Sequence, residues 1–151
     1  MKVSVLILQQ QWSFSRVIID SMQNILVTSA GKRVVLVELF KRALKACDQA
    51  AKVYTTDLNP ELAPAGIASD KCFRVPRVLS SDYISILLNI CVRNNIGMVI
   101  PTIDTELLVL SQNKQKFYDK GIALIISDFS FIQLCRDKRN TAIFFHEIGI
   151  R

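Results

Sequence analysis

Three short polar clusters hold the residue types that could bind an anion or a metal ion: Ser29–Arg33, Asp57–Pro60 and Thr102–Glu106. The first cluster follows a short apolar run and precedes a helical pattern that begins near Val34. A strand that ends in a small, glycine-containing turn at a helix N-terminus brings backbone N–H groups and the positive end of the helix dipole to one point. This arrangement favours a bound anion.

The first cluster does not match the common nucleotide-binding loops. A dinucleotide fingerprint needs three glycines at set spacing, and the turn supplies only Gly31, although Asp57 stands at the end of the next predicted strand, where a ribose-binding acid would lie. A P-loop is excluded because its first glycine is missing and Arg33 replaces its hydroxyl residue. The third cluster contains two carboxylates, Asp104 and Glu106. They could hold a metal or transfer protons, or they could simply complement the dipole at a helix start.

Alternating apolar patterns predict the elements that position these clusters. The predicted strands are Ile25–Thr28, Lys52–Thr56, Phe73–Val75, Met98–Ile100 and Ile122–Ile126. The predicted helices run from Val34 to Cys47, from Asp82 to Arg93, from Leu107 to Phe117, from Phe129 to Cys135, and from Asp137 to about Ile148. This order predicts an α/β fold with a Rossmann-like parallel sheet and helices on both faces. The three clusters then lie at the carboxyl ends of the strands, where such sheets bind ligands.

Composition and charge argue against several classes of function. The 151 residues carry a formal net charge of +6, but the basic residues are scattered, which does not favour nucleic acid. The four cysteines match no metal-binding spacing and are expected to be reduced and buried, as in a cytoplasmic protein. Since His146 is the only histidine, neither a metal site nor a catalytic triad is expected. The apolar run Val3–Leu8 is too short to span a membrane. A further hypothesis takes Met22 as the natural start and residues 1–21 as read-through of upstream sequence. The alternative is a genuine extension that packs as an extra strand or helix.

Four motifs occur in a fixed order along the chain. Together they resemble the N-terminal, or pre-ATP-grasp, domain of ATP-grasp ligases, and the branch similar to the carbamoyl-phosphate synthase large subunit resembles the chain most. The resemblance covers about residues 22–151. The motifs are Asn24–Arg33, Thr56–Pro60, Ile100–Leu107 and Cys135–Thr141.

The resemblance implies a Rossmann-like domain at residues 22–136 and a linking helix at 137–151 that leads into an ATP-grasp domain. Enzymes of this family activate a carboxylate as an acyl phosphate, which an amine or another nucleophile then attacks. By resemblance, Lys138 touches ATP phosphates. The substrate-facing residues are expected in the three clusters: Ser29, Ala30, Gly31, Lys32, Arg33, Asp57, Thr102, Asp104 and Glu106.

The chain departs from the family by stopping at Arg151, before the segments that hold Mg-ATP. We therefore expect no catalytic residue and no metal ligand here, and no tight binding of ATP or magnesium by this chain alone. Its expected partners are a small-molecule substrate, the remaining domains of a parent ligase, and a second copy through exposed apolar surface. The alternative interpretation is a stand-alone Rossmann-like module that binds a nucleotide or a small anion without catalysis.

Overall fold

Five parallel strands form the centre of the computed structural model, which describes residues 24–150. Their order in the sheet is β3-β2-β1-β4-β5, and every neighbouring pair is parallel. The α/β, Rossmann-like prediction is therefore confirmed. The strands are β1 (Asn24–Thr28), β2 (Val53–Asp57), β3 (Lys71–Arg74), β4 (Ile96–Pro101) and β5 (Ala123–Leu124).

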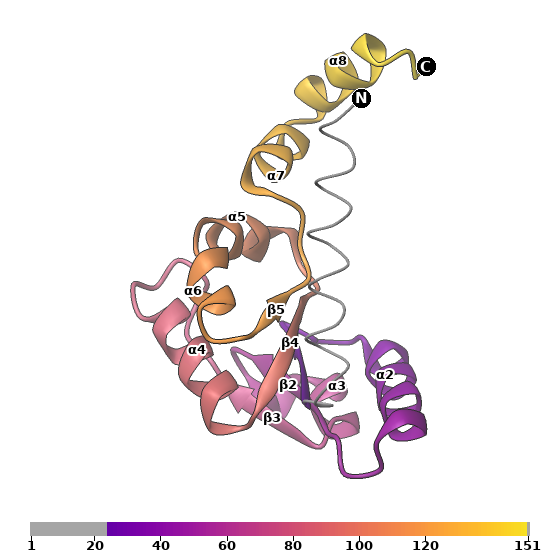
Figure 1. Ribbon diagram of the computed structural model, residues 1–151, viewed down its shortest axis with the longest axis vertical. Helices are drawn as coiled ribbons and strands as arrows, with labels where there is room; N and C mark the ends of the chain where they lie inside the picture. Colours follow the sequence, from indigo (N-terminus) through magenta and orange to yellow (C-terminus); the bar gives the residue numbers. More distant parts are fainter. Residues whose placement is uncertain (1–23, 151) are drawn as a thin grey trace.

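Helices cover both faces of the sheet. Figure 1 shows α2 and α3 on one side and α4, α5 and α6 on the other, while α7 and α8 extend beyond the sheet. The helices are α2 (Val34–Cys47), the 3₁₀ turn η1 (Pro60–Leu62), α3 (Pro64–Ala68), α4 (Tyr83–Arg93), α5 (Asp104–Gln112), α6 (Lys114–Tyr118), α7 (Phe129–Arg136) and α8 (Lys138–Glu147).

The alternation of side chains along the strands gives each face its own core. In β1, Ile25 and Val27 belong to the cluster beneath α2 and α3, whereas Leu26 belongs to the cluster beneath α4, α5 and α6. Because both faces are covered, β1 is apolar from Ile25 to Val27 and shows no polar alternation. The first cluster also contains Val37, Leu44, Val53 and Ala65, and the second contains Tyr83, Leu87, Cys91, Val99, Leu110 and Phe117.

Several local predictions were wrong. In the sequence, Pro60 and Pro64 predict that no helix runs through this loop. In the structure each of them starts a short helical turn, because the first position of a helix needs no N–H donor. The helix predicted from Leu107 to Phe117 is two helices that meet at Asn113. The last strand is only Ala123–Leu124, shorter than the apolar run that predicted it.

Burial on α2 and at the cysteines also differs from expectation. The helical spacing of apolar residues in α2 predicts an inner face made of Leu36, Leu39, Phe40, Ala43 and Cys47. The residues that α2 buries are instead Val37 and Leu44, and Leu39 is exposed. All four cysteines are free thiols, and Cys91 is fully buried. Cys47 and Cys135 are exposed, so the expectation of uniformly buried cysteines was wrong for these two.

The C-terminal helix follows its predicted limits. Asp137 caps α8 by accepting a hydrogen bond from the Arg139 N–H at 2.9 Å, and Gly149 ends it with a left-handed φ of +79°. No residue of α8 is buried. Across residues 24–150, none of the helices combines the length and apolar character needed to cross a bilayer. The hypothesis about Met22 and residues 1–21 lies outside the described residues.

Candidate functional site

The first and third clusters meet at the centre of the sheet. They follow β1 and β4, which are neighbours in the strand order, and the helices that continue from them, α2 and α5, cover opposite faces. This is a topological switch point, where the loops at the carboxyl ends of two adjacent strands diverge and leave a crevice for ligand. The first and third clusters therefore lie together at the ends of two adjacent strands, and their role as a binding site stays a prediction.

A single buried carboxylate joins these two loops. Glu106, near the start of α5, is fully buried and accepts hydrogen bonds from three hydroxyl groups. Thr28 Oγ1 at the end of β1 donates at 2.6 Å, the Tyr83 hydroxyl at the start of α4 donates at 2.8 Å, and Ser29 Oγ also donates. Glu106 therefore connects β1, α4 and α5. Its location makes it a positioning residue, since the carboxylate is enclosed by protein.

Tyr83 is the member of this network that sequence reasoning missed. It precedes the predicted inner face of α4 and carries no motif of its own, so only the folded arrangement of the neighbouring loops reveals its role. Burial, and secondarily the charge of Glu106 and the hydrogen bond to it, raise the pKa of Tyr83 far above its usual value. The phenol therefore keeps its proton and remains a hydrogen-bond donor at all physiological pH values.

Two further contacts hold the loops together. Thr102 Oγ1 lies 2.9 Å from the carbonyl oxygens of Thr28 and Ser29, to which it donates. Arg33 Nη2 donates in return to the Thr102 carbonyl at 2.7 Å, from the exposed side. The turn after β1 and the loop after β4 thus form one continuous surface.

Two backbone N–H groups of the turn after β1 are already hydrogen-bonded to β2. Ser29 has a φ of +48°, which is uncommon for a residue other than glycine, and Gly31 has a φ of +49°. The Ser29 N–H donates to Thr56 Oγ1 at 3.3 Å and the Ala30 N–H to the Thr56 carbonyl at 3.2 Å, while Ala30 is buried. Ser29 and Ala30 therefore shape the turn, and their amides are not directed to an anion.

The solvent-facing groups of the site are charged side chains. The side chains of Lys32 and Asp104 are exposed and make no hydrogen bond or ion pair with any residue between 24 and 150, and Arg33 is also exposed. Asp104 and Glu106 do not form the carboxylate pair considered from sequence, because one faces solvent and the other is enclosed by hydroxyl groups. In the described part of the chain, no group of three or more histidine, cysteine, aspartate or glutamate residues could hold a metal ion.

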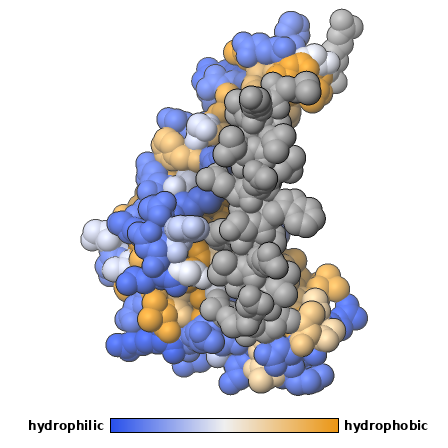
Figure 2. All heavy atoms as spheres, in the orientation of Figure 1, coloured by the Kyte–Doolittle hydropathy of each residue, from blue (hydrophilic) through white to orange (hydrophobic). Residues whose placement is uncertain are grey.

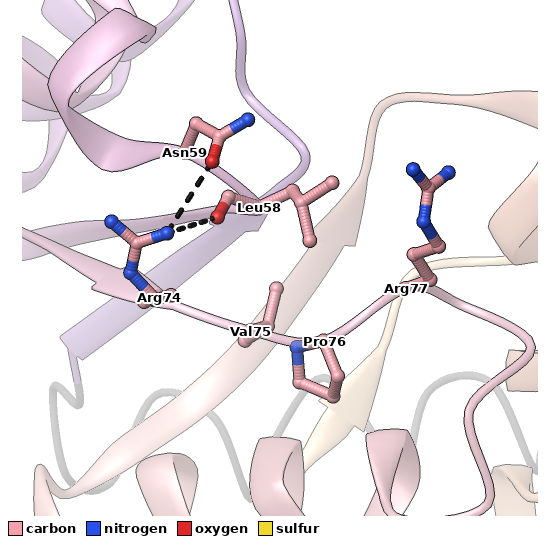
Figure 3. Close-up of a pocket in the computed structure, with 6 residues that line it drawn as sticks. All are labelled: Leu58, Asn59, Arg74, Val75, Pro76 and Arg77. Carbon is pink, nitrogen blue, oxygen red and sulfur yellow. Dashed lines mark hydrogen bonds between the residues drawn. The ribbon is translucent and has the colours of Figure 1, made fainter.

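The second cluster lies at the neighbouring edge, at the ends of β2 and β3. Asp57 Oδ1 accepts a hydrogen bond from the Asn59 N–H at 2.9 Å, and the Asp57 carbonyl accepts one from the Val75 N–H at 3.1 Å. Asp57 therefore shapes its own loop. Beside it, a shallow depression is lined by Leu58, Asn59, Arg74, Val75, Pro76 and Arg77 (Figure 3). Sequence reasoning assigned no role to Arg74 or Arg77.

Lys138 lies apart from these clusters in the chain, at the first position of α8. It is exposed, and it forms no hydrogen bond or ion pair with the residues that the structure describes. Figure 1 shows α8 beyond α7, at the far end of the molecule from α2. Its contact with ATP phosphates stays a prediction.

Comparison with known proteins gives one family and several similar folds. The family described as PylC-like, N-terminal domain, matches residues 25–125. No curated protein matches the sequence significantly. Among solved structures, the L-amino acid ligase from Bacillus licheniformis is similar with a TM-score of 0.60 at 16% identity over 85% of this chain and 31% of that chain.

Two carboxylase structures are similar to the same degree. The biotin carboxylase domain of a single-chain bacterial carboxylase has a TM-score of 0.58 at 12% identity, over 84% of this chain and 29% of that chain. The biotin carboxylase domain of Hydrogenobacter thermophilus 2-oxoglutarate carboxylase, a dimer in complex with MgADP, ADP and bicarbonate, has a TM-score of 0.57 at 14% identity, over 85% and 28%. The chain spans less than a third of each of these structures, and at such identities the similarity concerns the fold.

Proposed function

The chain belongs to the PylC-like N-terminal domain family, and from this premise we propose that it is the substrate-side domain of an ATP-grasp ligase. The proposed parent enzyme joins a carboxylate to an amine through an acyl phosphate. The similar folds support this proposal, because they are carboxylases and a ligase in which this domain is a minor part of the chain. On this view residues 22–136 are the domain and 137–151 connect it to the ATP-grasp region.

The observation that carries the proposal is that Glu106 links the loop after β4 to the end of β1 by hydrogen bonds. Three hydroxyl donors hold its carboxylate, so the start of α5 is fixed against the end of β1. Pre-organised loops lose little freedom when a ligand binds, which is what a substrate site needs. The exposed charges of Lys32, Arg33 and Asp104 lie on these fixed loops and are free to meet a substrate.

The signs of these charges fit an amino acid or another small molecule with both an acid and an amine. Lys32 and Arg33 supply cationic donors for a carboxylate, and Asp104 supplies an acceptor for an ammonium group. In the proposed reaction the carboxylate takes the γ-phosphoryl group of ATP and ADP leaves. The amine then attacks the acyl carbon, phosphate departs and a proton is released. This chain contributes orientation to that sequence.

Mg-ATP itself belongs to protein outside this domain in our proposal. The described residues contain no cluster suited to magnesium, and Lys138 is the one residue we assign to the ATP phosphates. We derive no step of phosphoryl transfer from this chain, and we propose that it is inactive alone.

Exposed apolar surface supports contacts with further protein. On α8, Ile143 is 58% exposed, and on α2, Val35 is 68% exposed. Figure 2 shows hydrophobic side chains near both ends of the visible face, around α8 and α2. We propose that the remaining domains of the parent cover the α8 surface, and that a second copy is the alternative occupant.

Nucleotide titration tests this function against a stand-alone binding module. Melting of the chain is followed with Mg-ATP, ADP and NAD, since a ligand that binds only the folded state at ten times its Kd stabilises it by about 1.4 kcal/mol. We expect no shift with any nucleotide, because the Ser29 and Ala30 amides are already engaged within the protein. Stabilisation that is equal in wild type and in Lys138→Ala would overturn the assignment and establish the turn after β1 as a nucleotide site. Lys120→Ala, at another exposed lysine, is the matched control.

A further inference from the structure

We propose that the depression at the ends of β2 and β3 is a second binding site, for an oxyanion carried on an apolar group. The site lies beyond the crevice between β1 and β4, and the proposal does not depend on the ligase assignment. Its six lining residues come from the loop after β2, from the last residue of β3 and from the loop that follows β3.

The backbone of both loops is held in place. The Val75 N–H donates to the Asp57 carbonyl at 3.1 Å, which ties the segment after β3 to the end of β2, and Val75 is buried. Pro76 restricts its own φ. The Ser80 N–H then donates to the Arg77 carbonyl at 2.9 Å, closing a turn that fixes the backbone of Arg77. The walls of the depression are therefore formed before any ligand arrives.

The polar groups on the left of Figure 3 are already paired. The Arg74 guanidinium donates to the Leu58 carbonyl at 2.9 Å, to Asn59 Oδ1 at 3.3 Å, and to both carboxylate oxygens of Glu61 at 2.6 and 2.7 Å. Glu61 thus balances the charge of Arg74. A backbone hydrogen bond, and after it the contact with this guanidinium, hold the pKa of Glu61 below its usual value. The Asn59 side-chain oxygen is also occupied.

The groups left open are donors. The Asn59 side-chain NH₂ remains, and the side chain of Arg77 forms no hydrogen bond or ion pair with the residues that the structure describes. Figure 3 shows the Arg77 guanidinium on the opposite side of the depression from Arg74, with the Leu58 side chain between them. An amide NH₂ and a guanidinium both donate, so they complement a group that only accepts hydrogen bonds.

The open donors and the apolar lining together favour one chemical class of ligand. A carboxylate or a phosphate is an acceptor-only group with the charge that Arg77 attracts, and charge-assisted bonds to arginine are the stronger kind. Leu58, Val75 and Pro76 supply the apolar part of the lining, which favours an aliphatic or aromatic body attached to the anion. A cation finds no open acceptor among these six lining side chains, and a neutral ligand forms no ion pair with Arg77.

The test is a titration of the ¹⁵N-labelled chain followed by NMR, with three probes that share a 3-methylbutyl group. They are 4-methylpentanoate, 3-methylbutyl phosphate, and the neutral 4-methylpentanamide. We expect saturable shifts of the Asn59 side-chain NH₂ and the Arg77 Nε–H resonances with one or both anions, at millimolar affinity, and much smaller shifts with the amide. Whichever anion binds more tightly identifies the carboxylate or the phosphate as the group that the site prefers.

Two variants and one control separate this site from general anion attraction. Arg77→Ala should weaken binding of the preferred anion about tenfold, as expected for loss of a charge-assisted hydrogen bond. Asn59→Asp keeps an oxygen for Arg74 but replaces the open donors with negative charge, and should also weaken it. Arg93→Ala, at an exposed arginine near the end of α4, should leave the affinity unchanged. The spectrum of each variant reports whether it is folded.

Three results would overturn the proposal. The first is an absence of shifts at Asn59 and Arg77 with both anions. The second is equal binding of the neutral amide. The third is an affinity that falls as much in Arg93→Ala as in Arg77→Ala, because that would make the binding a general response to positive charge.

Discussion

Replacing Glu106 by alanine should destabilise the domain strongly, although the residue lies in the first turn of a helix. The substitution removes the shared acceptor of three hydroxyl groups. Thr28 and Tyr83 are both fully buried, so their hydroxyls cannot turn to solvent. Ser29 is only partly buried and can exchange its lost partner for water.

The magnitude follows from those two buried donors. A buried hydroxyl left without an acceptor costs about 1–3 kcal/mol, so the pair costs about 2–6 kcal/mol. Removing the carboxylate also removes its own desolvation penalty, which offsets part of that loss. We therefore expect Glu106→Ala to lower the free energy of unfolding by about 3 kcal/mol. Asp104→Ala, an exposed carboxylate in the same turn, should change it by less than about 0.5 kcal/mol.

The assay is urea denaturation followed by far-UV circular dichroism, arranged as a double-mutant cycle with Tyr83→Phe. Removing the phenol hydroxyl should cost clearly less when Glu106 is already alanine, because the hydrogen bond is then absent. A loss below about 1 kcal/mol for Glu106→Ala, or equal costs of Tyr83→Phe in both backgrounds, would refute the view that this carboxylate fastens the two loops.

Three other outcomes follow from local geometry and titration. Gly66→Ala should destabilise by about 1–3 kcal/mol, because a Cβ there would lie 2.9 Å from the Cβ of Cys72; an unchanged urea midpoint would contradict this. Burial raises the pKa of Cys91 from 9.0 to about 12, so the folded state keeps a proton that the unfolded state releases. The contribution of Cys91 to stability should then fall above pH 9 by at most about 1.4 kcal/mol per pH unit. Cys91→Ala should remove this part of the slope, and equal slopes in both proteins would show the prediction wrong. Asp137→Ala removes the cap of α8 and the ion pair with Arg139, and should speed amide hydrogen exchange in α8 severalfold. The global melting temperature should stay unchanged, since α8 has no buried residue. A lower melting temperature would mean that α8 is part of the cooperative core.

The sequence predicted the order of the elements because both faces of the sheet are covered. Ile25–Val27 and Val99 are buried, so their segments appear as apolar runs between turn residues, and the strand-helix alternation then dictates a parallel sheet. The same reasoning placed the first and third clusters at one crevice. That prediction needed only the rule that parallel strands share an edge.

What the sequence could not show was which polar residues face solvent. Asp104 and Glu106 are two positions apart and look equivalent in the sequence, yet one is exposed and the other is enclosed by hydroxyls from β1, from the turn after it and from α4. The inner face of α2 was also predicted incorrectly, because its apolar residues surround much of the helix. Val35 and Leu39 remain outside while Val37 and Leu44 are buried, and only the position of the sheet decides between them.

The mass of the native polypeptide that carries this sequence tests the central claim most directly. The native protein would be captured from its source with an antibody raised against residues 24–150 and measured intact by mass spectrometry. Our account predicts a polypeptide about three times as long as this 17.0 kDa chain, since the chain spans 28–31% of the similar ligase and carboxylase structures. A native species of 17.0 kDa that carries no ATP-binding chain with it would contradict the assignment to an ATP-grasp ligase.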